Sequence, residues 1–200
     1  MIRIVLAEDQ KLLLGAIGAL LELDPNLKVV GSAATGAEAR ELIVTLAPDI
    51  VISDIEMPGM TGLDLAEWLA GARPHTRMLI LTTFARPGYL RRALDAGVAG
   101  YLLKETPAEQ LAEAVHRVHS GERVIAPELA LTAFGPPNPL TARERQVVAL
   151  AGKGVGNAEI SKRLHLAEGT VRNYLSEAMG KLNASNRVEA FRIARDQGWL

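Results

Sequence analysis

The residues most able to do chemistry lie where apolar stretches of the chain end. Asp54 follows the β-branched run 50–52 and Ser53, and Pro58 and Gly59 come soon after it. This pattern predicts a buried strand that ends in a sharp loop. Asp54 is therefore expected at the carboxyl edge of a sheet, where open α/β folds bind ligands. An isolated aspartate in such a place is more often a turn or capping residue, so Asp54 alone does not establish a site.

Other polar residues close three further apolar runs: Glu8 and Asp9 after 2–7, Thr82 in 78–83, and Lys104 after 100–103. Each of them has an ordinary structural explanation, as a helix cap, a strand former or a solvated lysine. Their joint placement at the ends of four predicted strands indicates a common site instead.

An acidic cluster beside an amine and a hydroxyl suits phosphoryl transfer. A carboxylate can attack a phosphoryl donor and hold the group as an acyl phosphate, and this reaction needs mainly positioning and neutralisation of oxygen charge. Mg²⁺ prefers oxygen ligands, and a cation relieves the repulsion among clustered carboxylates. We therefore expect Glu8, Asp9 and Asp54 to bind Mg²⁺. Lys104 and the Thr82 hydroxyl are expected to contact phosphoryl oxygens.

The pattern of residues 1–120 predicts the elements that position these groups. Predicted strands at 2–7, 28–34, 50–53, 78–83 and 100–103 alternate with predicted helices at 13–24, 35–46, 62–70, 88–96 and 106–120. Such alternation requires parallel strands with right-handed crossovers, and near-continuous apolar strands require cover on both faces. We predict an α/β fold with a doubly wound, five-stranded parallel sheet of flavodoxin-like type. Thr106 and Glu109 have capping-box spacing at the start of the last helix.

The rest of the chain has a different character. Residues 121–138 are predicted as a linker, because the Gly- and Pro-rich end of this stretch cannot continue a helix or a central strand. Residues 139–200 are predicted as a small all-α domain, with helices at 141–152, 157–165, 168–182 and 185–197. A short helix, a tight turn and a longer helix are typical of a helix-turn-helix, whose second helix enters the major groove.

The candidate DNA contacts lie on or beside this predicted motif. Arginine suits guanine and asparagine suits adenine, whereas a lysine at the helix end suits phosphates. The candidates are Asn157, Thr170, Val171, Arg172, Asn173, Ser176 and Lys181. Spacing alone favours equally a helical module that binds another protein.

The charge composition differs between residues 1–120 and residues 121–200, which favours two parts with different functions. The chain has 200 residues and no cysteine, which excludes disulfides and thiol-based sites. Residues 1–120 carry 11 Lys and Arg against 15 Asp and Glu, whereas residues 121–200 carry 11 against 8. An acidic first part suits a metal site and a basic second part suits nucleic acid. The absence of a long apolar run predicts a cytoplasmic protein without membrane insertion.

The first 120 residues resemble response-regulator receiver domains. The matching positions are Glu8-Asp9, Asp54 with Met57-Pro58 and Gly62, Thr82, Tyr101 and Lys104. The resemblance implies that Asp54 is the phosphoacceptor and that Asp9, Asp54 and the backbone carbonyl of Glu56 hold Mg²⁺, with support from Glu8. It also implies a switch in which Thr82 moves toward the phosphoryl group while the Tyr101 ring turns inward. Thr83 stands where many receivers have a smaller residue, and we expect it to restrict access.

The second part resembles the LuxR-type DNA-binding domain over most of residues 139–200. The resemblance rests on Leu140-Thr141-Ala142-Arg143-Glu144, on Asn157 with Glu159-Ile160, on Gly169 to Tyr174, and on Lys181-Leu182. Ala167, where the family commonly has a capping Ser, and Gly180 depart from it. Each departure costs the recognition helix about 1 kcal/mol, so we expect its end to rely on tertiary packing or DNA.

A receiver joined to this tail resembles the NarL/FixJ family of transcription regulators. The family implies phosphorylation by a sensor histidine kinase, then homodimerisation and binding to double-stranded DNA, and it implies no enzyme. The implied dimer face is either the first and last receiver helices or the fourth helix with the fifth strand. Within the family, the run 81–89 and the ending Gly198-Trp199 resemble a regulator of fatty-acid desaturase expression, which implies lipid-desaturation genes as targets.

Two other functions stay open at this point. One is a receiver whose helical tail binds protein. The other is a Mg²⁺-dependent aspartyl phosphatase, with Asp54 as transient nucleophile and Glu56 as acid. The phosphatase would need a substrate pocket or cap, and the chain has no remaining segment to supply one.

Overall fold

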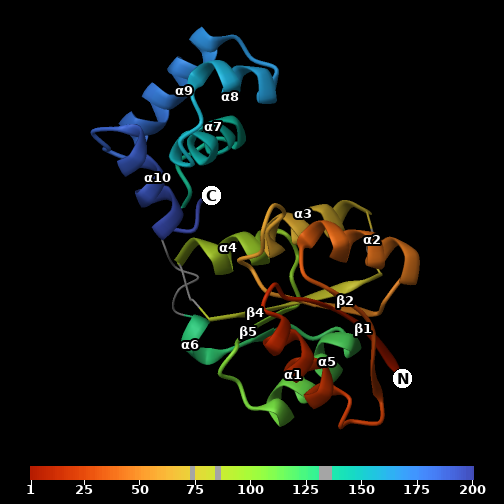
Figure 1. Ribbon diagram of the computed structural model, residues 1–200. Helices are drawn as coiled ribbons and strands as arrows, with labels where there is room; N and C mark the ends of the chain where they lie inside the picture. Colours follow the sequence, from red (N-terminus) through yellow and green to blue (C-terminus); the bar gives the residue numbers. More distant parts are fainter. Residues whose placement is uncertain (73–74, 84–86, 131–136) are drawn as a thin grey trace. The chain divides into compact units, whose positions relative to one another are not determined.

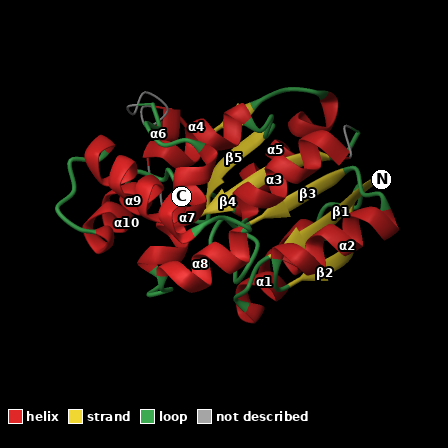
Figure 2. Ribbon diagram, turned by 90° about the horizontal axis from the view of Figure 1, so that it is seen from above, coloured by secondary structure: helices red, strands yellow, loops and turns green. Residues whose placement is uncertain are grey.

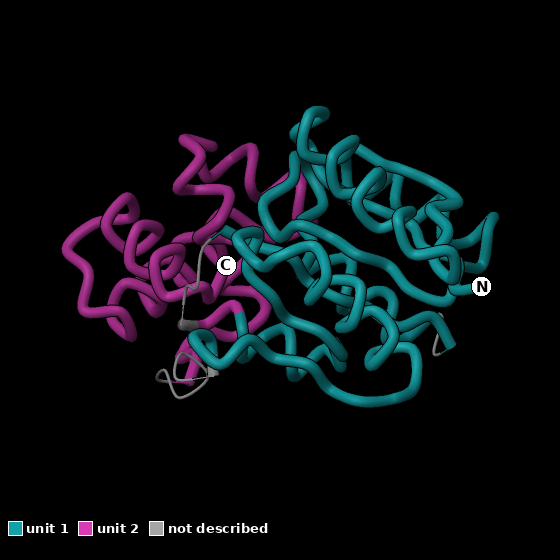
Figure 3. Tube along the Cα trace, turned by 90° about the horizontal axis from the view of Figure 1, so that it is seen from below, with its two compact units in different colours: residues 1–85, 90–134 teal, residues 86–89, 135–200 magenta. Residues whose placement is uncertain are grey.

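The computed structural model describes residues 1–72, 75–83, 87–130 and 137–200. The chain forms two compact units, one of residues 1–85 and 90–134, the other of residues 86–89 and 135–200 (Figure 3). The core of the predicted linker, residues 131–136, lies outside the described residues, as do residues 84–86 of the run 81–89. Among the described residues, no helix combines the length and the apolar character that a membrane span needs.

The first unit contains a parallel sheet in the order β2-β1-β3-β4-β5-β6 (Figures 1 and 2). Its strands are β1 (Ile2–Ala7), β2 (Leu27–Ala33), β3 (Ile50–Ser53), β4 (Arg77–Thr82), β5 (Gly100–Leu103) and β6 (Val124–Ile125). This confirms the predicted parallel α/β fold, but the predicted strand number of five is wrong. The sixth strand lies in the stretch predicted as a linker, and with two residues it is too short to show strand periodicity.

Helices cover both faces of this sheet, as the near-continuous apolar strands require. Figure 1 shows α2 (Gly36–Leu46), α3 (Gly62–Ala72) and α4 (Pro87–Asp95) on one face, and α1 (Lys11–Leu21) and α5 (Ala108–Ser120) on the other. Every residue of β3 is buried, as expected of a central strand between two helical layers. A short helix, α6 (Pro127–Ala130), follows β6.

Local sequence signals predict where some of the helices start, but not all of them. The Thr141 side chain and Glu144 form a complete capping box at the start of α7 (Ala142–Gly152). Thr35 accepts a hydrogen bond from the Glu38 backbone N–H at the start of α2. The capping box predicted at Thr106 is wrong, because α5 begins at Ala108 and Pro107 is its N-cap without a side-chain hydrogen bond.

The second unit is helical, as predicted. It contains α7 (Ala142–Gly152), α8 (Asn157–Leu164), α9 (Glu168–Lys181) and α10 (Arg187–Asp196). The buried residues form one hydrophobic cluster: Leu140, Val147, Val148, Ala151, Ile160, Val171, Leu175, Ala178, Leu182, Ala190 and Ala194. A short α8, a turn through His165 in the left-handed conformation and a longer α9 make the predicted helix-turn-helix.

Candidate functional site

The register of the parallel strands brings the predicted site residues to one edge of the sheet. Ala7 pairs with Ser53, and Ser53 pairs with Ile80, so β1, β3 and β4 end at similar heights. Thr82 pairs with Leu103 in the same way, which carries Lys104 to this edge. The parallel strands end side by side in Figure 2. The residues that follow them therefore share one site, although they lie far apart in the sequence.

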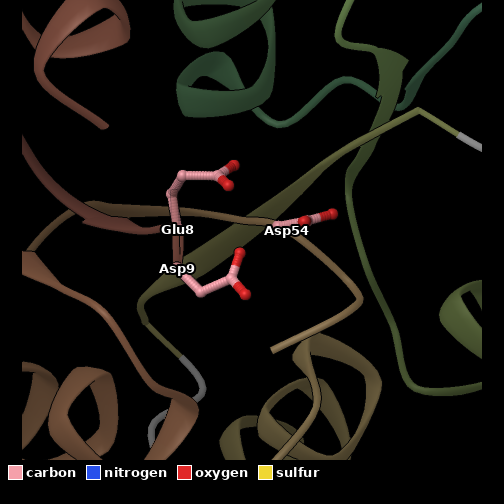
Figure 4. Close-up of side chains that lie close together, drawn as sticks. All are labelled: Glu8, Asp9 and Asp54. Atoms are coloured by element: carbon pink, nitrogen blue, oxygen red, sulfur yellow. The ribbon is translucent and has the colours of Figure 1, made fainter. Parts of the chain in front are cut away.

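Three carboxylates form the centre of this site. Glu8 and Asp9 follow β1 and Asp54 follows β3, and each offers an oxygen within 4.8 Å of those of the other two. Figure 4 shows the three side chains extending into the same space. Glu8 and Asp54 are buried, whereas Asp9 is exposed. The cluster thus has an interior side and a side open to water.

The Lys104 ammonium ion lies on the interior side of the cluster. Its Nζ is 2.6 Å from Glu8 Oε2 and 2.8 Å from Asp54 Oδ2, and its side chain is 5% exposed. Burial lowers the pKa of Lys104, but the hydrogen bonds to Asp54 and Glu8 raise it above its ordinary value, so the side chain is charged. Burial raises the pKa of Glu8, which the hydrogen bond from Lys104 offsets only in part. Lys104 therefore pairs with two of the three acids, Glu8 and Asp54.

The loop after β3 holds Asp54 through the backbone. The Ile55 N–H donates to Asp54 Oδ1 at 2.6 Å. The hydroxyl of the buried Ser53 donates to the Asp54 carbonyl oxygen at 2.7 Å. A side chain at Gly62 would place its Cβ 2.0 Å from that same oxygen, so only glycine permits the return of the chain into α3. Ser53 was missed as a positioning residue, and its only signal was a hydroxyl within a β-branched run.

The donor set fits Mg²⁺. Both oxygens of Glu8 are already used, by Lys104 and by the Gln10 N–H at 3.2 Å, which suits a supporting role. The exposed Asp9 carboxylate makes no hydrogen bond or ion pair within the described chain, so it is open to a cation. Mg²⁺ prefers oxygen ligands and usually keeps several bound waters, and this site offers carboxylate oxygens with one side open to water. The part of the Glu56 carbonyl in this site stays a prediction.

The two predicted switch residues are buried in the same unit. Thr82 ends β4 with 2% exposed, and Tyr101 lies in β5 with 1% exposed. Their movements on phosphorylation stay predictions. Thr83, which follows Thr82, is exposed at the edge that carries the carboxylates.

The predicted DNA contacts divide into three groups. Arg172, Asn173 and Ser176 are exposed on α9 and are free to meet a ligand. Val171 is completely buried in the core, so it does not face solvent and is removed from the candidate contacts. Of the remaining candidates, Asn157 and Thr170 are half-buried, and Lys181 forms an ion pair with Glu144.

Two known protein families match the two parts of the chain separately. Residues 4–116 match the family described as response regulator receiver domain. Residues 138–194 match the luxR family of bacterial regulatory proteins. The transcriptional regulatory protein DesR and the uncharacterized transcriptional regulatory protein YvfU, both from Bacillus subtilis, are each 48% identical over 200 residues and cover all of both chains. Their equal identity leaves the implied lipid-desaturation targets a prediction.

A solved structure agrees over the full length. The response regulator ChrA of a heme-sensing two-component system has a TM-score of 0.58 and 32% identity, and the match covers 100% of this chain and 98% of ChrA. The acidic edge lies within the receiver match and α9 within the luxR match. The chain therefore belongs to the NarL/FixJ-type two-component response regulators, with a receiver domain followed by a LuxR-type DNA-binding domain.

Proposed function

We propose that Asp54 accepts a phosphoryl group from a sensor histidine kinase and that this modification controls DNA binding and transcription. The observation that carries the proposal is the cluster of Glu8, Asp9 and Asp54, two of which, Glu8 and Asp54, pair with Lys104. Negative charge exceeds positive charge at this edge of the sheet, which suits a divalent cation and, with it, a phosphoryl group.

Each residue has a distinct part in the proposed reaction. A carboxylate oxygen of Asp54 forms the new bond to phosphorus while the bond from phosphorus to the kinase histidine breaks. Asp9 and Asp54, with the Glu56 carbonyl, would hold Mg²⁺, which supplies neutralisation of phosphoryl oxygen charge. Lys104 lies 2.8 Å from Asp54 and can transfer its hydrogen bond to a phosphoryl oxygen.

Receiver dimerisation is proposed on the α1–α5 face. Leu12, Leu20 and Leu23 are 90%, 44% and 77% exposed, and their spacing of eight and three residues places them on one side of α1 and its continuation. His116 of α5 contacts Asp24 at 2.7 Å beside this stripe, so α1 and α5 form one surface. An exposed apolar stripe is suited to a second copy of the chain. Of the two dimer faces that the family implies, this one has the stronger support.

DNA recognition is assigned to α9. Arg172 and Asn173 are exposed on this helix. An arginine side chain suits recognition of guanine, and an asparagine side chain suits recognition of adenine. Two α9 helices in a dimer would bind half-sites about one helical turn apart. The proposed binding to DNA and to a kinase of this class implies that the protein acts in the cytoplasm. The protein-binding alternative for the tail has no comparable support.

The test is DNA binding before and after treatment with Mg²⁺ and a small phosphodonor, using duplexes enriched from a random library. We expect phosphodonor to strengthen binding by the wild type and to leave Asp54→Asn unchanged. Leu12→Arg should accept the phosphoryl group but lose dimerisation, measured by analytical ultracentrifugation. Equal stimulation of Asp54→Asn would contradict the proposal. Steady consumption of the donor without stimulation would favour the phosphatase alternative.

A further inference from the structure

A carboxylate is completely buried in the DNA-binding unit. Glu144 of α7 is 0% exposed, and Lys181 Nζ contacts both of its oxygens, at 2.7 and 2.8 Å. Burial of a charged group is costly unless the charge is paired and hydrogen-bonded. Lys181 is the cation that neutralises Glu144.

The same carboxylate also completes the start of α7. Glu144 Oε2 accepts the Thr141 backbone N–H at 2.6 Å, and the Thr141 hydroxyl accepts the Glu144 N–H at 3.3 Å. The capping box orients the Glu144 side chain independently of its contact with α9. Glu144 is therefore a rigid anchor for the lysine that reaches it.

Lys181 is the last residue of α9, where this helix is locally weak. Gly180 precedes it, and a side chain there would meet nothing within 4 Å, so packing does not require the glycine. Glycine within a helix costs about 1 kcal/mol relative to alanine. At the other end of α9, the N-cap residue Ala167 supplies no side-chain hydrogen bond. The Lys181–Glu144 pair is thus a tertiary contact at an end of α9 that local sequence does not stabilise.

We propose that Lys181 is a positioning residue that holds the recognition helix α9 on α7 through Glu144, and that it does not bind a DNA phosphate. This inference rests on the proposed recognition of DNA by α9. A lysine committed to a buried carboxylate would leave that charge unpaired if it moved to a phosphate. The Lys181 side chain is 38% exposed, and its Nζ still contacts both Glu144 oxygens, at 2.7 and 2.8 Å.

The two roles predict different salt dependence. Loss of a phosphate contact lowers the slope of log K against log salt by about 0.9 for each contact, whereas loss of a positioning contact weakens binding without changing the slope. We expect full-length Lys181→Gln to bind an enriched duplex about tenfold more weakly at every salt concentration, as is typical of contacting pairs. Lys181→Arg should restore most of the affinity. Circular dichroism at the titration temperature ensures that only folded protein is compared.

A double-mutant cycle with Glu144→Gln provides the second arm. A lysine that acts through Glu144 should matter little once that charge is removed, so Glu144→Gln and Glu144→Gln/Lys181→Gln should bind alike and with the same slope. Glu144 carries no charge in either variant, and the Lys181 side chain, which is 38% exposed, can turn to water in the single variant. The comparison therefore remains informative if Lys181→Gln alone does not fold. A fallen slope, or the same loss in both backgrounds, would overturn the inference.

The wild type is titrated first in the same series. Absence of binding by the wild type would contradict the proposed DNA recognition and, with it, the role given to Lys181. Normal wild-type binding with a fallen slope in Lys181→Gln would contradict the role of Lys181 alone.

Discussion

Each of the two units contains a lysine that is paired with a buried glutamate, and the two pairs differ in their balance of charge. Lys104 faces Glu8 and Asp54, with Asp9 beside them and open to water. Lys181 faces Glu144 alone, and the capping box uses what remains of that carboxylate. An excess of acid creates a place for a metal and a phosphoryl group, whereas a one-to-one pair is already complete. The same type of ion pair therefore belongs to a reactive site in one unit and to a structural contact between two helices in the other.

The largest effect is expected from the lysine of the unbalanced cluster. Lys104→Gln should abolish the increase in dimerisation and DNA binding that phosphodonor causes, because no other cation among the described residues contacts Asp54. Sedimentation and DNA titration with and without phosphodonor measure the change. Lys28→Gln, an exposed lysine on β2, is the matched control and should respond as the wild type does. A full response from Lys104→Gln would remove the functional distinction between the two pairs.

Breaking the balanced pair should affect stability more than switching. Loss of one partner from a buried pair costs about 3–5 kcal/mol, and the 38% exposure of the Lys181 side chain reduces this to about 2–3 kcal/mol through solvent screening. Urea unfolding of Lys181→Gln should show this loss in the DNA-binding unit. Phosphorylation of Asp54 should be unchanged. An unaltered unfolding midpoint would mean that Glu144 is stabilised by other groups.

The same pair predicts a dependence on acid. Burial raises the pKa of Glu144, but hydrogen bonds from Lys181 and Thr141 hold it below its ordinary value of 4.5. The unfolded chain then binds a proton more readily, so this stabilisation is present above about pH 4.5 and is lost as the pH falls through the lower pKa of the folded state. Unfolding followed from pH 6 to about pH 3 should show a shallower acid dependence in Glu144→Gln. An identical dependence in both proteins would contradict the pairing.

The smallest expected effect concerns Gly180. Gly180→Ala should stabilise the DNA-binding unit by about 1 kcal/mol, because alanine favours the helix and its Cβ would meet nothing within 4 Å. Combined with Lys181→Gln, it should recover part of the lost stability. Thermal unfolding of the single and double variants measures both effects. Destabilisation by Gly180→Ala would show that the glycine is required at this position.

Sequence periodicity and family resemblance were sufficient for the fold class and for the residues at the strand ends. The β-branched run before Asp54 and the capping-box spacing at Thr141 are local signals, and both predicted the element that the structure contains. The strand β6 was missed because two residues carry no periodicity. Thr106 was misread because a capping pattern next to Pro107 does not fix where the helix begins.

Contacts between residues that lie far apart in the sequence could not be predicted from local sequence patterns. Lys181 and Glu144 lie 37 residues apart, and nothing in either segment signals the other. A lysine at the end of a recognition helix was read as a phosphate contact, which is the ordinary expectation for a basic residue beside DNA. The place of Val171 in the motif predicts a DNA contact, but its side chain belongs to the core. Burial and pairing, which decide between these roles, become visible only in the folded chain.

The most direct test of the account is intact mass after incubation with Mg²⁺ and a small phosphodonor, with Asp54→Asn alongside. The excess of carboxylates at the acidic edge predicts a single phosphoryl adduct on the wild type and none on Asp54→Asn. An adduct of equal yield on both proteins, or none on the wild type, would contradict the assignment of Asp54 as the phosphoacceptor.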